Sequence, residues 1–199
     1  AIELEEKAFG PDHPSLAYDL GMLGATLNGL SRPTEALVPL RRALVIQEKT
    51  LGPDHPDVAE TLGTLGLTVS YTGDHAGARP LLERAWRIFR QNFGDENLYT
   101  AETADNLAEI LRRLGEVPQA IALSEAALQT IERLGGPEHP GVATTLGHLA
   151  EHQVAAGRHA GGVHRAGQRF HGAVERAVGR RQRISHRARH PARRVDRIA

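Results

Sequence analysis

One phrase of the sequence returns at a constant interval. It reads FGPDHPSLAYDL at 9–20, LGPDHPDVAETL at 51–62 and GGPEHPGVATTL at 135–146. A more divergent copy, GDENLYTAETA, begins at Gly94, so that the glycines of successive copies lie 42 residues apart. Self-similarity at a fixed period of about 20 to 50 residues is typical of solenoids, in which each repeat packs against its neighbours.

The residues between the copies predict two helices in each repeat. Apolar residues recur there every three or four positions, which is the spacing of an amphipathic helix and not of a strand. In the second repeat we expect a helix A at about 56–72, a helix B at about 76–92 and a short turn at Gly73 and Asp74. The apolar stripe of the first helix A consists of Leu16, Leu20, Leu23 and Leu27.

The repeated phrase is predicted to end one helix and to begin the next. Gly52 stands where a helix-terminating glycine belongs, and Pro53 prevents the helix from continuing. Pro56 suits the first turn of the following helix, Asp54 is the candidate N-cap, and His55 is held extended by the proline after it. A metal site shared by the repeated histidines is disfavoured, because repeats lie about 10 Å apart or more whereas zinc ligands lie about 2 Å from the ion.

Small residues recur in the helices A, each directly after a leucine. They are Gly24, Gly66, Ala108 and Ala150. Together with an alanine that recurs in helix B, this pattern resembles the tetratricopeptide repeat, and the 42-residue period with LGPDHP between repeats is similar to its kinesin light chain type. The resemblance covers residues 1 to about 157. It implies an all-α, right-handed superhelical solenoid of antiparallel helix pairs.

The same resemblance implies a function in protein–protein interaction. The helices A would line a concave groove that takes a peptide or a partner domain, either from another protein or from a larger parent chain. The paired Asn that contacts peptides in this type of repeat is matched here by Asn106 alone. The residues expected to line the partner-binding groove are Tyr18, Asn28, Glu60, Leu67, Tyr71, Asn106, Glu109, Arg112 and Arg113.

Two further interpretations concern the charged and titratable residues near the end of the array. Arg112 and Arg113 also fit a solvated helix end, where cations are favourable. HLAEH, starting at His148, matches the H-x-x-E-H signature of one class of zinc peptidases, with Glu151 as the base. Leu149 holds a core position of the repeat, which gives this motif a structural explanation, so a zinc peptidase is only a remote alternative. We expect no enzyme, no cofactor and no metal site.

Composition changes abruptly near residue 157. Residues 1–156 hold 12 Lys and Arg against 22 Asp and Glu, whereas residues 157–199 hold 12 Arg against two acids and contain no Leu. We therefore predict a repeat array over 1–157, a fragment that starts within a helix B, and a basic Arg- and His-rich tail over 158–199 that is a degenerate repeat or disordered.

Three interpretations of this tail stay open. The first is a nucleic-acid-binding arm that acts through contacts with phosphate charges, which is the alternative function for this chain. The second is the product of a shifted reading frame, and the third is an ordinary disordered tail. Nucleic acid is the less favoured partner, because Phe170 is the tail's only aromatic residue and bases would find little to stack on.

The sequence also predicts the compartment. There is no Cys, which excludes disulfides and thiolate metal sites. No apolar run approaches the ~20 residues of a membrane span, and the N-terminal AIELEEKAFG lacks the features of a secretory signal. We expect a cytoplasmic protein without a membrane partner.

Overall fold

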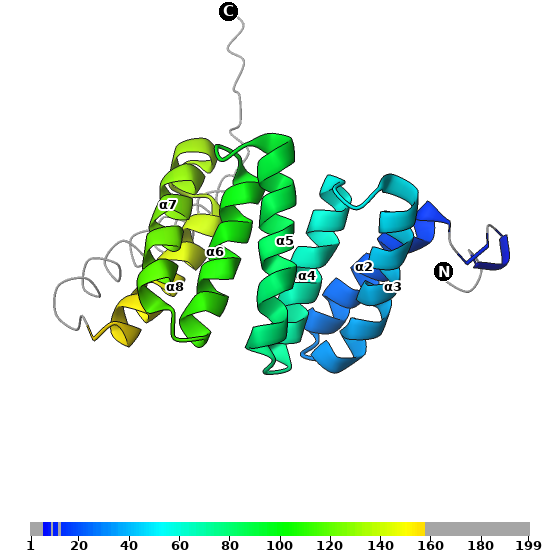
Figure 1. Ribbon diagram of the computed structural model, residues 1–199, viewed down its shortest axis with the longest axis horizontal. Helices are drawn as coiled ribbons and strands as arrows, with labels where there is room; N and C mark the ends of the chain where they lie inside the picture. The colour runs from blue at the N-terminus through cyan, green and yellow to red at the C-terminus, as the bar shows by residue number, and fades with distance from the viewer. Residues whose placement is uncertain (1–5, 9, 12, 158–199) are drawn as a thin grey trace, which may run out of the picture.

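The computed structural model describes residues 6–8, 10–11 and 13–157. After a short helical segment at 6–8, the helices are α2 (Pro14–Gly29), α3 (Pro33–Leu51), α4 (Pro56–Tyr71), α5 (His75–Phe93), α6 (Leu98–Arg113), α7 (Val117–Gly135) and α8 (Pro140–Ala155), as Figure 1 shows. The helices A and B predicted for the second repeat correspond to α4 and α5, with bounds that agree within one residue. The interpretations of residues 158–199 lie outside the described residues.

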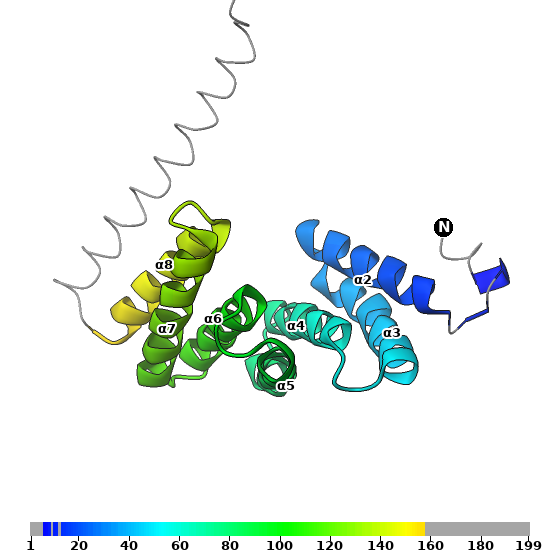
Figure 2. The same ribbon diagram turned by 90° about the horizontal axis from the view of Figure 1, so that it is seen from above.

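Consecutive helices pack as antiparallel pairs. The pairs are α2 with α3, α4 with α5, and α6 with α7, and α8 packs on α6 and α7 as the next helix A. Seen from above, the pairs follow an arc with α2 and α4 on its inner side and α3 and α5 on its outer side (Figure 2). The all-α solenoid predicted from the repeat is confirmed. We call the side formed by the helices A, which are α2, α4, α6 and α8, the concave face.

A histidine caps three of the four helices A. In α4, the Nδ1 of His55 accepts a hydrogen bond of 3.2 Å from the backbone N–H of Asp57. His13 and His139 do the same for α2 and α8. The expectation that Asp54 caps α4 is therefore wrong. The proline after the histidine holds the backbone at φ −73° and ψ 144°, which aims the imidazole back at the first helical N–H groups.

The repeated glycine of the phrase ends each helix B in the predicted way. Gly52, after α3, has a φ of 91°, in the left-handed region that residues with a side chain rarely adopt. Its N–H bonds to the carbonyl of Glu48, which closes the last turn of the helix. The glycines at the equivalent positions Gly10, Gly94 and Gly136 have φ values of 80–89°.

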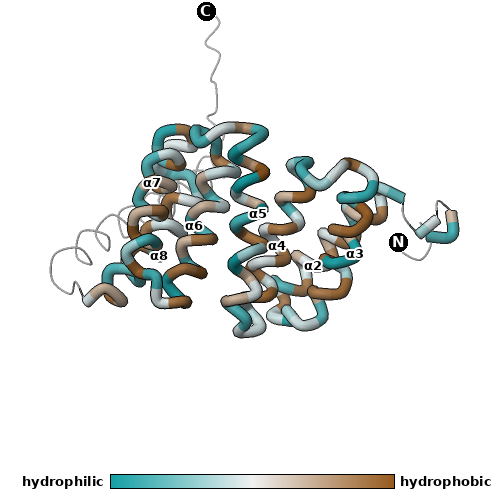
Figure 3. Tube along the Cα trace, in the orientation of Figure 1, coloured by the Kyte–Doolittle hydropathy of each residue, from teal (hydrophilic) through white to brown (hydrophobic). Residues whose placement is uncertain are grey.

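The core continues through neighbouring helix pairs, and within the first two pairs a small residue on helix A meets a large one on helix B. A Cβ on Gly66 of α4 would lie 2.8 Å from the Cγ of Leu82 on α5, so the leucine occupies the space that the glycine leaves. Gly24 and Leu40 repeat this arrangement in the first pair. Figure 3 shows apolar and polar residues alternating along each helix, as expected when one side of it is buried. In the described part of the chain, no helix is both long and apolar enough to cross a membrane.

Candidate functional site

The concave face is open between α2 and α4. A groove of about 380 Å³ lies between these two helices and is also lined by α3. On the α2 side it exposes Tyr18 and Met22, whose side chains are 69% and 52% accessible. Gly21 contributes no side chain, and a Cβ there would have no atom within 4 Å. We call this space the α2–α4 groove.

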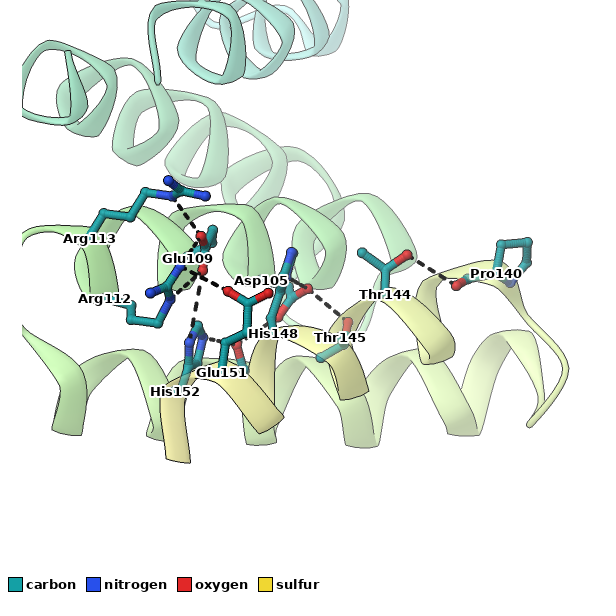
Figure 4. Close-up of polar contacts among 11 residues, drawn as sticks. Asp105, Glu109, Arg112, Arg113, Pro140, Thr144, Thr145, His148, Glu151 and His152 are labelled. Carbon is teal, nitrogen blue, oxygen red and sulfur yellow. Dashed lines mark hydrogen bonds and ion pairs between the residues drawn. The ribbon is translucent and has the colours of Figure 1, made fainter. Parts of the chain in front are cut away.

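The corresponding space between α6 and α8 is filled by polar side chains. Asp105 lies two repeats after Gly21 in the sequence, and it is only 3% exposed. His148 likewise lies two repeats after Thr64, which lines the α2–α4 groove. Neighbouring helices A therefore leave a groove at the start of the array, between α2 and α4. At its end, polar contacts bridge α6 and α8 (Figure 4).

Asp105 is the centre of these contacts. The hydroxyl of Ser124 on α7 donates to its Oδ1 at 2.6 Å, and the hydroxyl of Thr145 on α8 donates to its Oδ2 at 2.9 Å. The Nδ1 of His148 lies 2.8 Å from the same Oδ2. Burial lowers the pKa of His148, but the hydrogen bond to Asp105 and the nearby carboxylates outweigh it, so that this pKa is raised above its ordinary value. One carboxylate thus joins three helices.

His152 of α8 contacts Ser124, which is also a partner of Asp105, and is fully buried. Its burial lowers the pKa to about 4, so the imidazole is neutral near pH 7. Its Nε2 is 3.2 Å from the Oγ of Ser124, and because that hydroxyl's proton already goes to Asp105, the Nε2–H is the donor. Among the residues that the structure describes, the Nδ1 has no hydrogen-bond partner, and it lies 4.0 Å from the Oε2 of Glu109.

Glu109 holds the two arginines at the end of α6. Arg112 donates to both of its oxygens at 2.8 and 2.6 Å, and Arg113 donates at 2.7 Å. Burial raises the pKa of Glu109, but the two guanidinium groups more than offset this and lower it. Arg112 also pairs with Glu151 of α8 at 3.0 Å. The arginines are therefore ion-paired, in contrast to a simple solvated helix end.

Five of the nine residues predicted to line a groove lie in one of these two regions. Tyr18 and Glu60 line the α2–α4 groove, and Tyr71 is exposed at the end of α4. The amide of Asn28 donates to the Oγ1 of Thr68 at 2.7 Å, which joins α2 to α4. Leu67 and Asn106 are partly buried on α4 and α6. The other three predicted residues are Glu109, Arg112 and Arg113. They belong to what we call the polar cluster, whose other members are Asp105, Ser124, Thr145, His148, Glu151 and His152.

Sequence reasoning missed several residues of both regions. In the groove it overlooked Gln47 and Asp57, which line it from α3 and α4. In the polar cluster it overlooked Ser124, which stands where Leu40 and Leu82 stand in the earlier repeats. Comparison along the 42-residue register would have found it, because a serine at a position otherwise held by buried leucine needs a polar partner.

Both histidines of the HLAEH motif are held by protein contacts. His148 is hydrogen-bonded to Asp105, His152 contacts Ser124, and the two rings are stacked with centroids 6.3 Å apart. Glu151, the candidate base, pairs with Arg112. In the portion of the chain that the structure covers, no group of three His, Cys, Asp or Glu side chains is placed to hold a metal ion.

Comparison with known proteins identifies the repeat. The tetratricopeptide repeat family model matches residues 20–91 and 99–161, together more than half of the chain. A solved variant of a Podosopora anserina protein described as a kinesin light chain with nearly identical TPR-like repeats superposes with a TM-score of 0.68 at 22% identity, over 92% of this chain and 84% of that one. For BtubC (BKLC) from P. vanneervenii the TM-score is 0.65 at 21% identity, over 94% of this chain and 71% of that one.

A second structure of the Podosopora anserina repeats has a TM-score of 0.54 at 20% identity and covers 86% of this chain and 99% of that one. No curated protein sequence matches the chain significantly. At these identities the structural similarity concerns the fold alone.

Proposed function

The chain belongs to the tetratricopeptide repeat family, and from this premise we propose that it is a noncatalytic scaffold whose concave face binds a peptide or a domain of a partner protein. The observation that carries the proposal is the open α2–α4 groove. Exposed Tyr18 and Met22 border it, and a protein gains little from leaving such apolar surface in water unless a partner covers it.

We assign the two regions of the concave face different tasks. Tyr18, Glu60, Leu67, Tyr71 and Asn106 offer partly or fully exposed side chains on α2, α4 and α6, and would contact the partner. In the polar cluster, the acceptors and donors are mostly engaged with one another. Asn28 would join α2 to α4 through Thr68. Glu109, Arg112 and Arg113 would hold α6 and α8 together and present the outer edges of the arginines to a partner.

The chemistry of the polar cluster supports a scaffold rather than an enzyme. His152 is fully buried and neutral, so a substrate does not reach its imidazole, and Glu151, the candidate base of the motif, is paired with Arg112. A catalytic base needs an accessible reacting atom within hydrogen-bond reach. The nucleic-acid alternative depends on residues 158–199, which lie outside the described part of the chain.

A peptide selection tests the proposal. The whole chain is immobilised and used to select binders from a phage-displayed random peptide library, and the affinity of a selected peptide is measured by fluorescence anisotropy. Tyr18→Ala and Tyr71→Ala are expected to weaken binding about tenfold each, as exposed aromatic anchors do. Val45→Ala, which removes apolar surface that is 63% exposed on the outer helix α3, is the matched control and should change affinity less than about twofold.

Two results would contradict the proposal. One is a library that yields no binder to the folded chain. The other is a loss of affinity in Val45→Ala that equals or exceeds the loss in the tyrosine variants, because the binding surface would then lie on the outer side of the arc.

A further inference from the structure

We propose that the α2–α4 groove selects a peptide segment of another protein in which an arginine or lysine stands next to a large apolar residue. This inference rests on the proposed function and specifies its ligand. It follows from three properties of the groove: the sign of its charged groups, the hydrogen-bonding groups left available in it, and the position of its apolar surface.

The charged side chains that line the groove are both acidic. They are Asp57 and Glu60, one turn apart on the exposed side of α4. Among the residues that the structure describes, no lysine or arginine lines this space, and Asp57 contacts the imidazole of His55 at 3.7 Å. A cationic side chain in the groove would gain two carboxylates, whereas an acidic side chain would meet two like charges.

The available hydrogen-bonding groups are mainly acceptors. The Oε1 of Gln47 on α3 is buried and has no hydrogen-bond partner in the part of the chain described. The hydroxyls of Thr50 and Thr64 already donate to carbonyls of their own helices, at 2.8 and 3.1 Å. A guanidinium or ammonium group carries only hydrogen-bond donors, and it would donate to the Oε1 of Gln47 and to the carboxylates.

Apolar surface borders the acidic side chains. Tyr18 and Met22 stand on α2 across the groove from α4, and Leu51, 40% exposed, lies at the end of α3. A large apolar side chain of the peptide would cover these residues while the neighbouring cation faces α4. The absence of a side chain at Gly21 leaves room for this apolar side chain, since no atom lies within 4 Å of the place where the Cβ of residue 21 would be.

The far end of the concave face does not offer the opposite preference. Arg112 and Arg113 share Glu109, and Arg112 also contacts Glu151, so these two cations face two carboxylates of the protein itself. An acidic peptide would have to displace those contacts to reach the arginines. The preference of the concave face for cationic peptides is therefore set by the α2–α4 groove.

A double-mutant cycle tests the inference. Peptides selected on the whole chain are expected to be enriched in Arg or Lys beside Leu, Ile, Met or an aromatic residue. Replacing that Arg or Lys by Gln should weaken binding to the unmodified chain about tenfold, the effect of one charge-assisted hydrogen bond. With Glu60→Gln the same peptide change should have a smaller effect, about threefold, because one of the two carboxylates that face the cation is gone. Glu125→Gln, an equal charge change on an exposed side chain of α7, should preserve the full tenfold effect.

Each other outcome overturns the inference. Binders without enrichment in cations, or a peptide effect that is equal in Glu60→Gln and in the unmodified chain, would refute the ligand class while leaving the scaffold function intact. The absence of any binder would remove both. If a synthetic peptide of residues 158–199 competes more tightly than every selected peptide, the chain's own basic segment is the occupant and the assignment to another protein is wrong.

Discussion

The hydroxyl of Ser124 on α7 donates a 2.6 Å hydrogen bond to the carboxylate of Asp105 on α6. Both residues are at least 97% buried. In the earlier pairs, the position of Ser124 is held by a leucine that packs against a glycine. Because α8 joins the same carboxylate through Thr145 and His148, the last repeat is attached by polar contacts at a place where the first repeats leave a groove.

Removing this carboxylate should loosen the end of the array. Asp105→Ala leaves two buried hydroxyls and one imidazole without their acceptor, and a lost partner in a buried polar network costs about 3 kcal/mol of unfolding free energy. Urea unfolding followed by circular dichroism measures it. Glu125→Ala, at an exposed position of α7, is the control and should change stability by less than about 0.5 kcal/mol. A loss below about 1 kcal/mol in Asp105→Ala would mean that the cluster is solvated and not structural.

Stability should fall between pH 7 and pH 5 because of His152. Its pKa is about 4 in the folded chain against an ordinary 6.5, so the unfolded state takes up a proton first, and this contributes about 2 kcal/mol of destabilisation by pH 5. His148 acts in the opposite direction: its raised pKa gives stability that is present below its ordinary value and is lost as pH rises. His152→Ile, which restores the residue found at Ile110 one repeat earlier, should flatten the decline. Melting temperatures at several pH values measure it, and parallel curves for the two proteins would contradict it.

Two glycines of α4 should respond oppositely to the same substitution. Gly66→Ala places a Cβ 2.8 Å from the Cγ of Leu82, and this overpacking should exceed the gain in helix propensity. Gly63→Ala meets no atom within 4 Å and should stabilise the helix by up to about 1 kcal/mol. The expected difference between the variants is about 2 kcal/mol in urea unfolding. Equal effects would show that Leu82 does not fix the approach of α4 and α5.

The histidine of the repeated phrase should behave as a helix cap. His55→Ala removes the bond to the N–H of Asp57 and should cost about 1 kcal/mol, whereas His55→Asn supplies another cap acceptor and should retain the stability. Asn97 already serves this purpose at the start of α6, where its Oδ1 accepts from the N–H of Tyr99 at 2.8 Å. Thermal unfolding of both variants measures the effect. A stable alanine variant together with a destabilised asparagine variant would reject the capping role.

Much of the fold could be predicted from the sequence because the repeat shows each boundary several times. The proline and glycine of LGPDHP locate the end of α3 and the start of α4 within one residue, and the small residues Gly24 and Gly66 indicate where paired helices approach. Which side chain caps a helix depends on where it points. Asp54 and His55 are both able to accept a hydrogen bond, and only the coordinates show that the imidazole reaches the N–H.

The candidate site was less accessible to sequence reasoning because it depends on pairs from different repeats. The resemblance to the repeat family places Tyr18 and Glu60 on helices A, and both line the α2–α4 groove; that they contact a partner stays a prediction. The pairs of Glu109 with Arg112 and Arg113 have the i,i+3 and i,i+4 spacing of one helix and were within reach of sequence reasoning. That Arg112 also reaches Glu151 of α8, and that Gln47 of a helix B reaches the groove, depends on side-chain directions between helices. Such contacts have no spacing of their own in the sequence.

The claim that a partner lies in the groove between α2 and α4 can be tested by paramagnetic relaxation enhancement. A selected peptide carrying a nitroxide is added to the ¹⁵N-labelled chain, and the broadening of backbone amide signals is recorded. We predict strong broadening at Gly21 and Gly63 of the concave face, with Gly77 of the outer helix α5 remaining sharp. Broadening of Gly77 with sharp signals at Gly21 and Gly63 would contradict the account.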